Sequence, residues 1–128
     1  MSLSMKLDLI ALIASCNRLI QRFIERHHFL VYQLKHWTER RNIIIRCIMR
    51  PNTIPPEYMR RASSISDWIC GAHKDLVNQV IPMTGLYEDE IKKCWFDMIR
   101  CQARMFQFRR NLSNNEQFDV AHHIASFL

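Results

Sequence analysis

The sequence of 128 residues predicts an all-α fold. Apolar residues make up 48% of it, yet it contains only two glycines and four prolines, and a sheet protein needs many more of these residues at its turns. Apolar residues recur at intervals of three and four, which is the period of a helix packed on one side, and period-two alternation is absent. We therefore expect one domain, residues 1–128, in which three long helices and a short C-terminal helix form a helical bundle with an unusually long first helix.

The first helix is expected over residues 5–49, because neither glycine nor proline occurs between Leu3 and Arg50. Two seams of mainly apolar residues repeat every seven residues within it, as in packed helix pairs. One seam contains Leu9, Cys16, Phe23, Leu30, Trp37 and Ile44, and the other contains Ile13, Ile20, His27, Leu34, Arg41 and Ile48. The segment RPNTIPPE ends this helix, since Pro51 disfavours a helical conformation at Arg50.

Three further helices complete the predicted bundle. The second is expected over residues 55–81, between the prolines of RPNTIPPE and a stop at PMTG. The third is expected over residues 86–111, because acidic residues stand at its start and Arg109 and Arg110 at its end, as the helix dipole favours. The fourth, over residues 115–127, follows a capping box formed by Ser113 and Glu116.

The expected length of the first helix has a consequence for function. At 1.5 Å per residue it extends about 67 Å, whereas the second and third helices reach only about 38 Å each. Unless the first helix breaks near WTERRN, part of its seam, including Leu9, Ile13, Cys16 and Ile20, has no partner within the chain. An uncovered apolar stripe of this kind indicates an interface with self or another helical chain.

Positive charge is concentrated in the first half of the chain. Residues 1–61 contain eleven Lys and Arg against four acidic residues, and residues 62–128 contain seven against eight. Such a basic helix could face phosphates or meet an acidic partner, and the excess of arginine does not separate the two. Candidate nucleic-acid contacts are Arg18, Arg22, Arg26, Lys35, Arg40 and Arg46.

No motif for catalysis or for a cofactor is recognised. None of the six histidines is spaced as H-x-x-x-H, and no set of nucleophile and base or of paired carboxylates stands out. The five cysteines are odd in number and form no C-x-x-C pair, which favours reduced thiols in the cytoplasm or nucleus over secretion. We expect no metal, no cofactor, no enzyme activity and no membrane span.

One short motif suggests regulation. In RRASS, the residues Arg60, Arg61 and Ser63 match the R-R-x-S pattern that basophilic kinases select, so Ser63 is a candidate phosphorylation site. The sequence predicts a helix interior at this position, where a plain helix surface is the favoured interpretation.

These patterns predict a non-catalytic protein-protein interaction module or scaffold that assembles into a homo-oligomer or hetero-complex. Apolar helix faces would bind the partner, and neighbouring arginines would orient it. The candidate partner-binding residues are Leu9, Ile13, Cys16, Ile20, Phe23, Arg22 and Trp37. The alternative is a basic helical adaptor that binds RNA or DNA.

Overall fold

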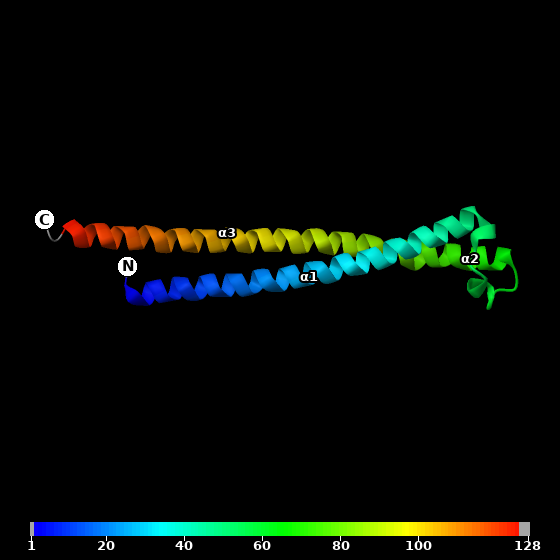
Figure 1. The fold of residues 1–128 in the computed structure, drawn as a ribbon, viewed down its shortest axis with the longest axis horizontal. Coiled ribbons are helices and arrows are strands. Elements are labelled where there is room, and N and C mark those ends of the chain that lie inside the picture. Colours follow the sequence, from blue (N-terminus) through cyan, green and yellow to red (C-terminus); the bar gives the residue numbers. More distant parts are fainter. Residues whose placement is uncertain (1, 126–128) are drawn as a thin grey trace. The chain divides into compact units, whose positions relative to one another are not determined.

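The computed structural model describes the backbone of residues 2–125 and the side chains of residues 2–114 (Figure 1). Within that range the secondary structure is helical, so the all-α prediction is confirmed. The helix α1 spans Leu3–Met49, as long as the sequence predicts, and two short 3₁₀ turns follow it, at Pro51–Thr53 and Pro56–Met59. The remaining elements are α2 (Ile65–Asp75), a single π-helical turn (Leu76–Val80) and α3 (Ile81–Ala125).

The prediction of three long helices is wrong, because the helix does not stop at PMTG. Proline lacks an N–H and its ring clashes with the carbonyl four residues earlier, so it normally ends or kinks a helix. Here the π turn ends at Val80, two residues before Pro82, with the Ile81 N–H bonded to the Leu76 oxygen five residues back. π turns commonly occur where a helix accommodates a residue that breaks its hydrogen-bond pattern, and the helix runs through Pro82 and on through Gly85.

The predicted fourth helix is also wrong as a separate element. Ser113 lies within α3 rather than at a helix start, and α3 continues to Ala125. The side chains of residues 115–127, over which the fourth helix was expected, lie outside those that the structure describes. With 47 residues in α1 and 45 in α3, the expected mismatch in helix length is absent.

The chain divides into two compact units. Unit 1 consists of Met1–His27 and Lys93–Leu128, and unit 2 consists of His28–Lys92. Each unit combines one part of α1 with a segment from the second half of the chain.

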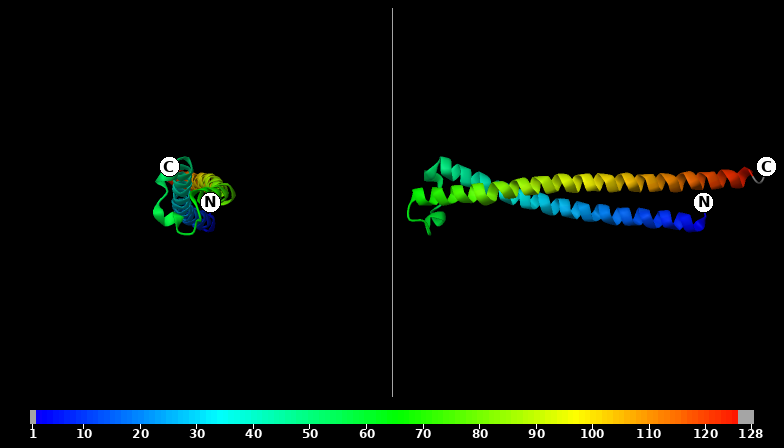
Figure 2. Two further views of the ribbon diagram at one scale, coloured as in Figure 1. Left: turned by 90° about the vertical axis from the view of Figure 1, so that its right-hand side faces the viewer. Right: turned by 180° about the vertical axis from the view of Figure 1, so that it is seen from behind.

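In unit 1 the first part of α1 packs antiparallel against α3 (Figures 1 and 2). The Cys94 thiol donates a hydrogen bond to the Phe23 carbonyl, and the Cys101 thiol donates one to the Cys16 carbonyl, each at 3.3 Å. From the first bond to the second, the residue number rises by seven on α3 and falls by seven on α1. The two bonds therefore fix the antiparallel direction and the register of the two helices. The core is a cluster of Cys16, Ile20, Met98 and Cys101.

In unit 2 the second part of α1 is followed by the turn region and α2. Ser64 caps α2, since its hydroxyl oxygen accepts a hydrogen bond from the Asp67 N–H at 3.1 Å. Ile44, Leu76 and Val80 form the buried cluster of this unit. The Arg40 guanidinium donates a hydrogen bond to the Asp75 carboxylate at 2.5 Å and thereby links α1 to the end of α2.

Candidate interaction surface

Most of the predicted partner-binding seam faces inward. Cys16 and Ile20 are only 7% and 5% exposed and belong to the core of unit 1. Phe23 packs against the same cluster, while Leu9 and Ile13 are partly buried. The expectation that this stretch lacks a partner within the chain is therefore wrong, because α3 supplies the partner.

The other two predicted partner-binding residues, Arg22 and Trp37, do not belong to the core of unit 1. Arg22 is exposed on α1. Trp37 lies in unit 2, where it packs against the Ile44 cluster and lies beneath the Arg40 guanidinium, 5.3 Å from its carbon to the ring centre. Trp37 is thus a partly buried residue of unit 2 rather than an open anchor.

A second apolar row lies on the outside of α1. Leu3, Leu7, Ile10 and Ala14 are spaced by four, three and four residues, and all four are exposed. With a helical repeat of about 100° per residue, these side chains lie well away from the seam that packs on α3. Leu3 is 73% exposed, so the row is open to solvent.

A matching outer row lies on α3. Phe96, Ile99, Ala103 and Phe106 are spaced by three, four and three residues and are all exposed. This spacing is that of a helix-packing seam, and the helical repeat puts it on the side of α3 opposite the buried Cys94, Met98 and Cys101. Exposed Trp95 borders the row.

The two outer rows both face away from the contact between α1 and α3 in unit 1. The α1 row lies on one flank of its seam and the α3 row on the side of α3 away from its buried stripe, while the register set by the two thiol hydrogen bonds brings Ile10 level with Phe106. We call the combined surface of Leu3, Leu7, Ile10, Trp95, Phe96, Ile99 and Phe106 the apolar face.

The apolar face is large for a surface exposed to water. Trp95, Phe96 and Phe106 are 49%, 61% and 68% exposed, which together amounts to roughly 350 Å² of aromatic surface at about 200 Å² per side chain. Four exposed aliphatic side chains, Leu3, Leu7, Ile10 and Ile99, add to this area, and large exposed apolar surfaces commonly mark interaction sites. A face of this extent indicates an interface.

The opposite flank of unit 1 is basic. Arg18, Arg22 and Arg26 are exposed and follow one another at intervals of four on α1. Exposed Lys93, Arg100 and Arg104 lie on the corresponding side of α3. Leu12 and Leu19 also lie on this flank of α1, so it is mixed in character.

The predicted basic contacts of unit 2 are less uniform. Lys35 and Arg46 are exposed, whereas Arg40 is already paired with Asp75 and stacked on Trp37. Arg40 therefore offers less free charge to a phosphate than the sequence suggested.

Ser63 is not in a helix interior, and that part of the prediction is wrong. It is exposed in the non-helical segment that precedes the capping residue Ser64. A phosphate there would also stand near the positive end of α2. Phosphorylation at Ser63 remains a prediction.

A histidine and two cysteines are among the titratable groups at or beside the core of unit 1. His27 lies beside Trp95, with ring centres 6.1 Å apart. Burial raises the pKa of the Cys101 thiol, and its neighbour Cys16 adds to the increase. Among the residues whose side chains are described, no group of three or more His, Cys, Asp and Glu could hold a metal ion.

The chain matches no protein-family model, and neither a curated protein nor a solved structure is significantly similar to it. Among the residues that the structure describes, no helix is both long and apolar enough to cross a membrane.

Sequence reasoning found the inner seam but missed the outer rows. The signal was present, since Leu3, Leu7 and Ile10 on one helix and Phe96, Ile99 and Phe106 on another each have helical spacing. Choosing between the two rows of one helix requires the register of its partner, which the sequence does not supply.

Proposed function

We propose that the chain is a non-catalytic interaction module or scaffold, acting as a single domain, that assembles through the apolar face of unit 1 with itself or with another helical chain. The observation that carries this proposal is that apolar rows of helix-packing spacing point outward from two neighbouring helices. Burying such rows against further helices is the usual way to remove them from water.

The binding mechanism is helix-to-helix packing. Phe96, Phe106 and Trp95 are suited to anchor the contact, because large aromatic side chains dominate the energetics of interfaces. The basic flank would remain outside the contact and orient an acidic partner surface by charge. The five free thiols fit the reducing cytoplasm or nucleus as the place of assembly.

The test is self-association of the purified full chain. We expect the mass measured by sedimentation equilibrium to rise above that of a 15.4 kDa monomer as the concentration increases. The double variant Ile10→Asp with Phe106→Asp should remain monomeric while its helical circular dichroism is unchanged, since both positions are exposed.

The matched control is Leu19→Asp, a similar exposed position on the other flank of α1. This variant should associate as the unchanged chain does. If the unchanged chain is monomeric at every concentration, self-association is wrong and the partner is a different chain. If the control loses association as fully as the double variant, the contact is not specific to the apolar face.

The second candidate function is a basic adaptor that binds RNA or DNA, which the basic flank of unit 1 favours. Salt separates the two candidates, because phosphate contacts weaken steeply as salt rises while an apolar contact does not. Replacing Arg18, Arg22 and Arg26 with Gln should lower affinity for a random oligonucleotide if this function is correct. No change in affinity would contradict it.

A further inference from the structure

Unit 2 contains a hollow that the assembly proposal does not use. It has a volume of about 630 Å³ and lies between residues 36–44 of α1 and α2, beside the segment that leads into α2. Pockets for small organic ligands commonly measure about 300–1,000 Å³. At roughly 30 Å³ per water-sized group, the space would take a molecule of on the order of 20 non-hydrogen atoms.

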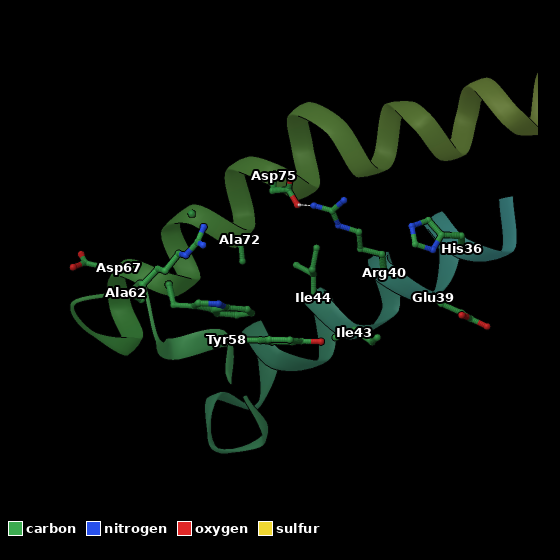
Figure 3. Close-up of a pocket in the computed structure, with 13 residues that line it drawn as sticks. His36, Glu39, Arg40, Ile43, Ile44, Tyr58, Ala62, Asp67, Ala72 and Asp75 are labelled. Atoms are coloured by element: carbon green, nitrogen blue, oxygen red, sulfur yellow. Dashed lines mark hydrogen bonds and ion pairs between the residues drawn. The ribbon is translucent and has the colours of Figure 1, made fainter. Parts of the chain in front are cut away.

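The hollow exists because small residues face large ones. Ala62 and Ala72 lie on one side of the hollow, and Ile43 and Ile44 of α1 form the wall on the other (Figure 3). Gly71 also lines the hollow and, without a side chain, leaves space. A methyl group added at Gly71 would meet no atom within 4 Å. The space is thus a property of these side chains.

One wall of the hollow is aromatic. The rings of Tyr58 and Trp68 stack on each other, with an interplanar angle of 7° and centres 6.2 Å apart. Together with the two isoleucines they present apolar and π surface to an occupant. A flat aromatic body packs well against such a wall.

Three carboxylates (Glu39, Asp67 and Asp75) and two guanidinium groups (Arg40 and Arg61) line the hollow, so their individual pairing and direction decide which charge it can accept. Asp75 is neutralised by Arg40, and the carboxylates of Glu39 and Asp67 point away from the space between α1 and α2 (Figure 3). Arg61 also lines the hollow, is exposed, and has no ion pair with any residue whose side chain is described. Its guanidinium is therefore available to an anionic group.

We propose that this hollow binds a small organic anion with an aromatic body, which rests on the Tyr58 and Trp68 wall while its carboxylate or sulfonate pairs with Arg61. Such a site is independent of the apolar face, which lies in unit 1. A bound molecule would also stabilise unit 2, since it binds the folded state alone.

The first test uses anilinonaphthalene sulfonate, an aromatic anion whose fluorescence rises in an apolar site, titrated into the full chain. Gly71→Leu should fill the hollow and weaken binding at least about tenfold, because the probe loses its contact with the walls. Leucine is a better helix former than glycine, so the substitution does not threaten α2.

The matched control is Gly85→Leu, the same change at a helical glycine that is equally free of neighbours and does not line the hollow. It should bind the probe within about twofold of the unchanged chain, well under the 1.4 kcal/mol of a tenfold change. Equal weakening in both variants, or none in either, would overturn the proposed site and indicate that the probe binds elsewhere, such as on the apolar face.

The second test addresses the charge. Arg61→Gln should weaken the sulfonate probe about tenfold, as expected for loss of one charge-assisted hydrogen bond, and leave phenylnaphthylamine, the uncharged probe of similar shape, unchanged. Arg60→Gln, at an exposed neighbour that does not line the hollow, should affect neither probe. If Arg61→Gln weakens both probes equally, the preference for an anion is wrong.

Discussion

Units 1 and 2 use the same helix, α1, in contrasting ways. In unit 1 the inner seam packs closely on α3, and the unmatched apolar residues stand outside on the apolar face. In unit 2 the small residues Gly71 and Ala72 leave a hollow on the inside, beside Ile44. The comparison indicates that the exposed apolar surface of unit 1 is suited to bind another helix, whereas the hollow of unit 2 is suited to bind a small molecule.

The largest expected effect comes from a matched pair of core truncations. Ile20 and Ile44 are both buried residues of α1, one in each cluster. We expect Ile20→Ala to lower the free energy of unfolding by about 4 kcal/mol and Ile44→Ala by about 2 kcal/mol, within the range for such changes. The second is smaller because Ile44 already borders the hollow and loses fewer contacts.

Urea denaturation measures both values, and amide hydrogen exchange shows where protection is lost. If the units open separately, Ile20→Ala should lower protection in unit 1 and leave the α2 amides protected. Equal losses for the two variants would contradict the difference in packing between the clusters.

The caps of the two units provide the next comparison. Ser64 caps α2 in the interior of the chain, and the Ser2 hydroxyl accepts a hydrogen bond from the Met5 N–H at 3.2 Å near the start of α1. Ser64→Ala should cost about 1 kcal/mol. Ser2→Ala should cost only a few tenths, because a helix terminus frays readily.

Thermal unfolding followed by circular dichroism measures both costs. Ser66→Ala is the control, since this exposed serine lies within α2 and does not cap it. A loss at Ser66 as large as that at Ser64 would show that the cap is not the cause.

The length and the inner seam of α1 were predictable because they depend on local features. Forty-seven residues form one helix without an internal breaker, and Pro51 follows its end. The continuation through Pro82 was not predictable, since it depends on a π turn, and the capping box at Ser113 gave way to an uninterrupted helix. In both cases a local sequence signal, a proline or a capping box, predicted a helix boundary at a place where the helix continues.

The candidate sites were less predictable than the fold. The thiol hydrogen bonds that set the register of unit 1 join residues 71 and 85 positions apart. The hollow likewise requires Ala62 and Gly71 to face Ile43 of α1. No periodicity within one helix contains this information, so the outer rows and the hollow emerge only from the packed structure.

A smaller effect is expected for the ion pair of unit 2. Arg40 and Asp75 are 40% and 30% exposed, so water and salt screen their attraction. Asp75→Asn should lower the free energy of unfolding by about 0.5 kcal/mol, as is typical of partly exposed pairs. The loss should shrink in 1 M salt, and a loss that does not depend on salt would mean that the hydrogen bond rather than the charge stabilises the contact.

The smallest effect at neutral pH concerns the Cys101 thiol in the core of unit 1. Burial raises its pKa in the folded chain above the ordinary value of 9.0, while nearby Arg104 opposes the increase only in part. The unfolded chain therefore loses this proton first as the pH rises, which favours unfolding. We expect the contribution of Cys101 to the free energy of unfolding to be constant below about pH 8 and to fall above it as the pH approaches the folded-state pKa.

Urea denaturation between pH 7 and pH 10.5 measures how the free energy of unfolding depends on pH. Cys101→Ala should make this dependence weaker, whereas Cys70→Ala, at an exposed thiol, should leave it unchanged. If the Cys101→Ala curve runs parallel to that of the unchanged chain, the buried thiol does not account for the alkaline loss, and the packing of unit 1 is looser around α3 than its core cluster indicates.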